Sequence, residues 1–147
     1  MSVNVRRMMP AFLLALIILF AFVFTAALAD SPTVIYSGEC GSEAVWTLDS
    51  EGTLIISGSG RMTNYKTAGA VPWYLERETI KKVVVEPGIE RIGDYAFDAC
   101  AVTEVNLPDG LVTIERYAFY GCDKLTELNI PDSVTSIGNY ASGTAPL

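Results

Sequence analysis

The side chains that could support catalysis or metal binding in this chain are few. The sequence contains no histidine, which excludes Ser-His-Asp and Cys-His catalysis, HExxH zinc sites and histidine-based pH switches. Carboxylates are plentiful, with 17 Asp and Glu residues, and paired carboxylates can hydrolyse glycosidic bonds. The sequence indicates no cleft that would bring two of them together, so we predict no catalytic, metal-binding or cofactor-binding residues.

Three cysteines, Cys40, Cys100 and Cys122, are the remaining reactive groups. They form no CxxC pair, so a zinc site has no support, and their odd number leaves at least one thiol unpaired. We expect them to pack in the interior, because a free cysteine behaves as a small hydrophobic side chain. A Cys100–Cys122 disulfide is the alternative, if adjacent parts of the fold bring the two residues close together.

The charge distribution separates the first 29 residues from the rest of the chain. The whole chain has a formal charge of −7, but all 17 acidic residues follow residue 29. Once Arg6 and Arg7 are set aside, eight basic residues remain against these acids, so the segment after residue 29 has a formal charge of −9. An acidic domain of this size repels phosphate backbones, and we therefore expect no nucleic-acid partner.

Residues 1–29 have the three parts of a secretory signal peptide. Arg6 and Arg7 supply the basic part, residues 11–24 (AFLLALIILFAFVF) form an unbroken apolar run, and Ala27 and Ala29 give an A-x-A ending. We therefore predict cleavage after Ala29 and a secreted or cell-surface protein. The alternative is a membrane anchor, because the apolar stretch approaches the ~20 residues that span a bilayer. The chain would then contact the membrane through this segment alone.

The second half of the chain repeats itself. Residues 80–101 (IKKVVVEPGIERIGDYAFDACA) match residues 102–124 at a constant offset of 22, which aligns Cys100 with Cys122. Residues 125–147 form a third, incomplete unit at an offset of 23, because Lys124 is an added residue. Apolar positions, a Tyr-Ala-Phe triplet and turn residues recur together, so an accidental match is improbable.

Each unit begins with an apolar-x-x-apolar-x-apolar pattern, whose last two positions alternate as one face of a strand requires. Pro108 and Pro131 then interrupt the strand, since proline lacks the donor that a ladder needs. The Tyr-Ala-Phe block that follows is predicted to form a helical turn, closed by Gly121 in the second unit. One unit cannot bury its apolar side chains alone, but stacked units can. We therefore expect successive coils that place Phe97 and Phe119 one above the other.

The segments VTEVNLPDGLVTIERYAFYGC and LTELNIPDSVTSIGNYA resemble the leucine-rich repeats of the BspA-like family of bacterial and protozoan surface proteins. The likeness extends upstream to Trp46, Gly52 and the Pro72-Trp73-Tyr74 segment. The resemblance implies a right-handed solenoid of about three coils, mainly β with short helical turns, on a secreted or surface protein that binds or adheres. The family has no shared catalytic residues, so the resemblance implies no enzyme activity.

Residues 30–79 are predicted to form a β-rich cap segment before the repeats at 80–147. Strands are expected at residues 33–38, 44–48 and 53–57, as a hairpin or small meander. Tyr65, Trp73 and Tyr74 would, in one interpretation, form an exposed patch for carbohydrate or protein. We favour a cap over the open end of the core, because repeat stacks need their ends protected.

The third unit stops early. Ser142 stands where the repeat requires phenylalanine, and the chain then ends in SGTAPL. We expect an open stack of this kind to expose its core or to pair with another chain. The last turn should be the least ordered part of the array, and the chain resembles a shortened member of a longer architecture.

The outward side chains of the repeat strands form the candidate binding face. They fall into three rows, which are Lys81, Thr103 and Thr126; Lys82, Glu104 and Glu127; and Val84, Asn106 and Asn129. Lys82 beside Glu104 is a favourable cross-strand pair, whereas Glu104 beside Glu127 is a like-charge pair that a cation could relieve. The alternative is a solvated face that binds nothing.

Export together with repeats predicts a non-catalytic extracellular binding or adhesion module. Its partner would be an extracellular protein or a glycan, bound without a cofactor. The competing hypothesis is a passive spacer, or a fragment that serves a larger surface protein. The two hypotheses differ in whether the chain by itself binds an extracellular ligand.

Overall fold

The computed structural model describes residues 31–143. The predicted signal peptide and the last four residues of the chain lie outside this range. Among the residues that are described, no helix is long and apolar enough to cross a membrane. The chain from Thr33 onward forms a compact unit of its own, and the description below concerns that unit.

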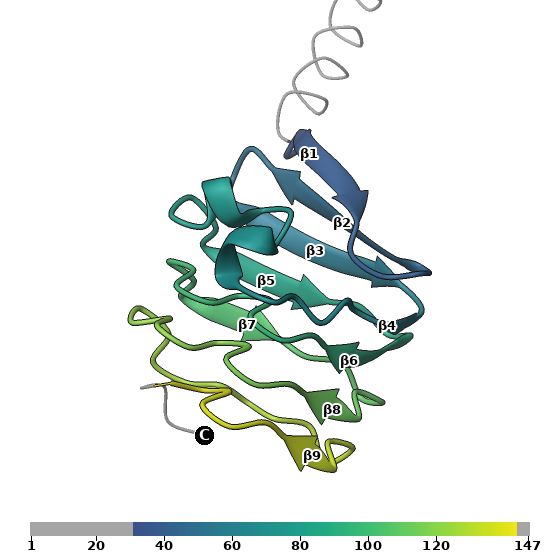
Figure 1. Ribbon diagram of the computed structural model, residues 1–147. Helices are drawn as coiled ribbons and strands as arrows, with labels where there is room; N and C mark the ends of the chain where they lie inside the picture. Colours follow the sequence, from purple (N-terminus) through teal and green to yellow (C-terminus); the bar gives the residue numbers. More distant parts are fainter. Residues whose placement is uncertain (1–30, 144–147) are drawn as a thin grey trace, which may run out of the picture. The chain divides into compact units, whose positions relative to one another are not determined.

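The unit begins with an antiparallel meander (Figure 1). It consists of β1 (Val34–Glu39), β2 (Ala44–Asp49) and β3 (Thr53–Gly58), which pair in sequence order. The three predicted strands are therefore confirmed, with bounds that shift by one residue. The turn between β2 and β3 is fixed by the Asp49 carboxylate, which accepts hydrogen bonds from the N–H groups of Glu51 (2.9 Å) and Thr53 (2.8 Å). Gly52 completes the turn with a φ of +88°, which favours glycine.

The repeats continue this sheet with parallel strands. β5 (Lys82–Val85) pairs with β3, and β7 (Glu104–Asn106) pairs with β5. A second sheet contains β4 (Gly60–Arg61), β6 (Ile89–Ile92), β8 (Thr113–Ile114) and β9 (Ser136–Ile137), in that order and all parallel. Only two short 3-10 helices are described, η1 (Ala68–Ala70) and η2 (Tyr74–Glu76). This arrangement confirms the predicted fold class, a mainly β repeat solenoid.

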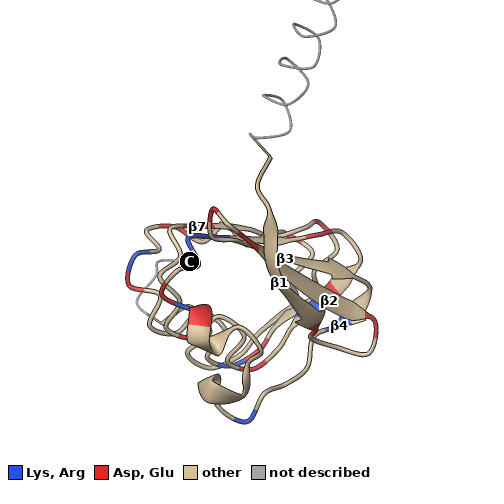
Figure 2. Cartoon of the chain, turned by 90° about the horizontal axis from the view of Figure 1, so that it is seen from above, with Lys and Arg blue, Asp and Glu red and all other residues tan. Residues whose placement is uncertain are grey.

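The strand registers reproduce the sequence offsets. Val83 pairs with Val105 at an offset of 22, and Ile114 pairs with Ile137 at an offset of 23. Seen from above in Figure 2, the coils lie over one another, and acidic segments are spread around their circumference. Equal coil length therefore places equivalent side chains in columns, as stacking of repeat units requires.

The interior contains a column of aromatic rings among aliphatic side chains. The rings of Phe97 and Phe119 stack with centroids 5.1 Å apart and an interplanar angle of 25°, and both side chains are fully buried. Trp73 extends the column on the N-terminal side of Phe97, with ring centroids 5.8 Å apart. The prediction that Phe97 and Phe119 lie one above the other is confirmed.

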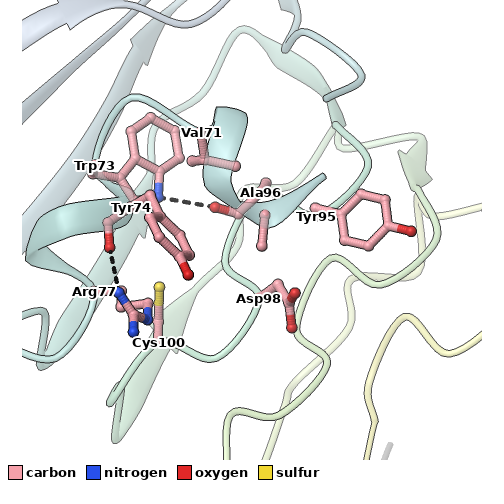
Figure 3. A pocket seen from close by; sticks show the side chains of 9 residues that line it. Val71, Trp73, Tyr74, Arg77, Tyr95, Ala96, Asp98 and Cys100 are labelled. Atoms are coloured by element: carbon pink, nitrogen blue, oxygen red, sulfur yellow. Dashed lines mark hydrogen bonds between the residues drawn. The ribbon is translucent and has the colours of Figure 1, made fainter. Parts of the chain in front are cut away.

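Trp73 and Tyr65 are buried beside the first coil rather than exposed. The Trp73 indole N–H donates to the Ala96 carbonyl at 2.9 Å, and Trp46 contacts the Trp73 ring edge to face at 5.4 Å. Figure 3 shows this hydrogen bond, together with Arg77, which donates to the Tyr74 carbonyl. Trp73 and Tyr65 therefore belong to the interior and do not form a surface patch. The division into segments 30–79 and 80–147 stays a prediction, and β3 and β5 join the two in one sheet.

The prediction of a helical turn at the Tyr-Ala-Phe block is wrong. Tyr95, Tyr117 and Tyr140 have φ values of 59°, 56° and 59°, which lie in the left-handed region and cannot continue a right-handed helical turn. The three rings instead stack on one another, at 4.9 Å between the first two and 5.2 Å between the last two. Backbone hydrogen bonds between coils accompany the stack, such as Phe97 N–H to the Ala118 carbonyl at 2.8 Å. Each turn is therefore stabilised by bonds to the next coil as well as by tight-turn bonds of its own, such as Asp98 N–H to the Tyr95 carbonyl at 3.2 Å.

The third coil keeps its interior but loses its first strand. Leu125 and Leu128 are buried, yet no strand forms over residues 125–130. Ile137 and Tyr140 are 45% and 65% exposed, because no further described coil follows to cover their C-terminal side. These exposed side chains agree with the expectation that the third coil leaves part of its core uncovered.

All three cysteines are buried and free. Cys100 and Cys122 occupy equivalent places in adjacent coils, and the Cys122 thiol donates to the Phe97 carbonyl at 3.1 Å. Burial raises the pKa of the Cys122 thiol to about 12 and also raises the pKa of Cys100. The cysteines therefore act as interior packing residues, and the alternative disulfide is not formed.

Candidate binding surface

The candidate face is built by β5 and β7, which lie side by side in register. Side chains alternate along these strands, so that Val83, Val85 and Val105 are buried while their neighbours point outward. The register sets Lys82 beside Glu104 and Val84 beside Asn106. Because the inner residues are fixed in the core, the outer side chains are held on a rigid scaffold.

Lys82, Glu104 and Asn106 form one connected polar group on this face. The Lys82 ammonium lies 2.7 Å from Oε1 of Glu104, and the Asn106 side-chain amide donates to the same oxygen at 3.1 Å. The hydrogen bond from Lys82, joined by that from Asn106, lowers the pKa of the Glu104 carboxyl. The predicted Lys82–Glu104 pair is therefore formed, and Glu104 stays ionised with its partners at neutral pH.

Thr103 belongs to the scaffold more than to the open surface. Its N–H donates to the Lys81 carbonyl at 2.8 Å, and its hydroxyl donates to the same oxygen at 3.2 Å. Both polar groups of Thr103 are thus used to join the first coil to the second. A ligand on this face would meet the Thr103 methyl group more readily than a free hydroxyl.

The third coil does not extend the sheet, which corrects the expectation of three continuous rows. Thr126, Glu127 and Asn129 are exposed, but the five-stranded sheet ends at β7. The added residue Lys124 lengthens the connection into this coil, and no strand pairing with β7 follows. Glu104 has Lys82 and Asn106 as partners, and the structure does not set Glu127 beside it in a strand register. Across residues 31–143, no three Asp, Glu or Cys side chains gather in a way that could hold a metal ion.

Sequence reasoning missed a hollow of about 500 Å³ outside this face, which we call the β1–η2 groove. Residues from three separate segments line it: Ile35, Tyr36, Asp49, Ser50, Glu51, Gly52, Glu76, Glu78, Thr79 and Lys81. No motif marks the groove, because its walls come together only when the meander folds against the segment after η2. A second hollow, lined by Trp73, Arg77 and Cys100 (Figure 3), is filled by these side chains and has no room for a water molecule.

Solved structures of similar fold are leucine-rich repeat proteins. A leucine-rich repeat protein from Eubacterium ventriosum is 26% identical over 75% of this chain and 36% of its own, with a TM-score of 0.63. A leucine-rich cell surface protein from Faecalibacterium prausnitzii is 25% identical over 77% of this chain and 34% of its own, with a TM-score of 0.41. The chain thus spans about a third of the length of each. No curated protein matches the chain.

A family model agrees with these structures. The family described as the BspA type leucine-rich repeat region (6 copies) matches residues 74–143. This match begins in η2 and includes both β5 and β7 of the candidate face. It confirms the resemblance carried by the repeated Tyr-Ala-Phe units. Residues 74–143 of this chain are therefore similar to the BspA type leucine-rich repeat region.

Proposed function

We propose that this chain is a non-catalytic extracellular binding module that recognises a protein or glycan through the face around Lys82, Glu104 and Asn106. The observation that supports this most strongly is the polar group itself. Glu104 and Asn106 are exposed and Lys82 is half-buried, and all three are held in place by strands whose opposite side is buried. A surface that is preorganised in this way loses little side-chain freedom when it binds a partner.

Export is the second part of the proposal. The basic, apolar and A-x-A parts of residues 1–29 are those of a signal peptide. A secreted or surface-attached chain would meet extracellular proteins and glycans, which are the partners proposed here.

Binding to arrays of extracellular matrix proteins and glycans tests the proposal. The full-length chain, kept in a non-ionic detergent, should bind at least one class of ligand. The double variant Lys82→Ala/Asn106→Ala should weaken that binding at least tenfold. A matched double variant of exposed residues outside this face, Lys66→Ala/Asn139→Ala, should leave it unchanged. Absence of binding to every ligand would favour the passive spacer and refute the module.

A further inference from the structure

β1 offers an unpaired strand edge. It stands at the end of the five-stranded sheet and, among the described residues, pairs only with β2. Val34, Ile35 and Tyr36 are 56%, 52% and 47% exposed. Natural edge strands are often protected by lysine, proline or a β-bulge. The sequence of β1, VIYSGE, contains neither lysine nor proline, and its irregularity is confined to the start of the strand, between Val34 and Tyr36. The main-chain donors and acceptors of this edge are thus open to another extended segment.

A β-bulge turns the start of this strand toward the β1–η2 groove. Val34 pairs with Asp49 and Tyr36 pairs with Leu48, so Ile35 is an extra residue without a partner on β2. A bulge of this kind redirects a side chain and bends the strand. Ile35 and Tyr36 both line the groove. Ile35 and Tyr36 thus connect the start of this edge strand to the groove.

The groove is rigid and large enough for several side chains. Its volume of about 500 Å³ falls within the range of ligand pockets. The Ser50 N–H donates to the Thr33 carbonyl at 2.9 Å, the Lys81 N–H donates to the Gly52 carbonyl at 2.9 Å, and the Thr79 N–H donates to the Glu76 carbonyl at 2.8 Å. The first two bonds join different segments of the wall, and the third bond fixes the turn after η2. The groove therefore needs little rearrangement to receive a ligand.

The charge of the groove indicates a basic occupant. Four carboxylates line it against the single ammonium of Lys81. Asp49 is held by its own turn, and Glu78, whose side chain is largely exposed, has only a long ion pair with Arg77 at 3.9 Å. Glu51 and Glu76 are the carboxylates of the groove without a charged partner. Within the described part of the chain, no three such groups converge as metal ligands. The negative charge is thus spread along the groove, which suits an extended partner with several separated positive charges better than a single ion.

We propose that the β1–η2 groove receives an extended basic peptide segment, which adds to the free edge of β1 as a further strand and sets lysine or arginine side chains against Glu51, Glu76 and Glu78. Addition of a strand to a sheet edge is an established way for proteins to recognise peptides. A second copy of this chain is a poor occupant, because eight basic residues stand against 17 acidic ones after residue 29. This surface is separate from the β5–β7 face, and the proposal does not depend on it.

Two synthetic peptides test the proposal on the full-length chain in non-ionic detergent. One has eight residues that alternate lysine and threonine, and the other has glutamate in place of each lysine. Fluorescence anisotropy should show binding of the lysine peptide alone, with an affinity that falls at high salt. The triple variant Glu51→Gln/Glu76→Gln/Glu78→Gln should weaken binding at least tenfold. The matched triple variant Glu115→Gln/Glu127→Gln/Asp132→Asn removes the same charge elsewhere and should retain most of it.

A second variant separates strand addition from charge attraction. Ile35→Pro leaves the charge of the groove unchanged and removes a main-chain donor at the bulge, a position where proline is tolerated, and it should also weaken binding at least tenfold. Hydrogen exchange should show new protection of β1 amides when the lysine peptide is bound. The proposal is overturned if the peptide does not bind, if both triple variants lose binding equally, if protection appears on another element, or if lysine amide alone binds as tightly as the peptide.

Discussion

The stacked rings of Phe97 and Phe119 allow a quantitative test of the interior column. Replacing either ring with alanine should lower the free energy of unfolding by about 3–5 kcal/mol, because both side chains are fully buried. The direct ring–ring contribution should be about 0.5–1.5 kcal/mol of this loss. Phe97 contacts rings on both sides, at 5.8 Å and 5.1 Å, so Phe97→Ala should cost more than Phe119→Ala.

A double-mutant cycle isolates the stacking energy. The variants Phe97→Leu, Phe119→Leu and their combination keep the interior apolar while they remove the rings. Urea unfolding of the full-length chain in non-ionic detergent, followed by the emission of the buried Trp46 and Trp73, gives the free energies. A coupling of about 0.5–1.5 kcal/mol is expected between the two sites. The control cycle of Phe97→Leu with Val34→Ala, which lies on the exposed edge strand, should give a coupling near zero. Equal couplings in both cycles would refute the column.

Three further predictions concern order, pH and packing. Hydrogen exchange should show residues 125–142 less protected than residues 102–124, and equal protection would contradict the open end. Burial raises the pKa of Cys122 to about 12. As the pH rises, the Cys122 thiol of the unfolded chain therefore loses its proton at a lower pH than the thiol of the folded chain. The thiol's contribution to stability should therefore be complete below about pH 9 and fall as the pH rises toward 12. Urea unfolding at pH 8 and 10.5 checks this, and the fall should be smaller in Cys122→Ala. Gly93→Ala should lower stability by about 1–3 kcal/mol, because its new Cβ would overlap the Thr63 carbonyl oxygen. The Cβ added by Gly69→Ala meets no atom within 4 Å, so this control variant should keep the stability of the original chain. Equal melting temperatures of the two variants would contradict the prediction.

The repeat period allowed much of the fold to be predicted from the sequence. A constant offset of 22 residues aligns Val83 with Val105 and Phe97 with Phe119, and the structure sets both pairs next to each other. Periodicity succeeds here because each coil must bury the same positions against its neighbours. The Lys82–Glu104 pair follows from the same register.

Features that depend on backbone conformation or on distant segments were not predictable in the same way. The Tyr-Ala-Phe block has a composition that allows a helical turn, but the left-handed φ of Tyr95 is set by stacking and by bonds to the next coil. The repeat alignment identifies Lys124 as an added residue. The insertion of one residue does not by itself predict that the strand after it is absent. The β1–η2 groove joins residues as far apart as Ile35 and Lys81, and no repeat relates them.

The most direct test of the stacked coils is the contact between equivalent aromatic rings in solution. Nuclear Overhauser spectroscopy on the full-length chain with labelled aromatic residues should show contacts between the ring protons of Phe97 and Phe119. It should also show contacts between those of Tyr95 and Tyr117, whose centroids are 4.9 Å apart. Contacts from these rings to unrelated residues, with none between equivalent positions, would contradict the shared interior on which the binding face depends.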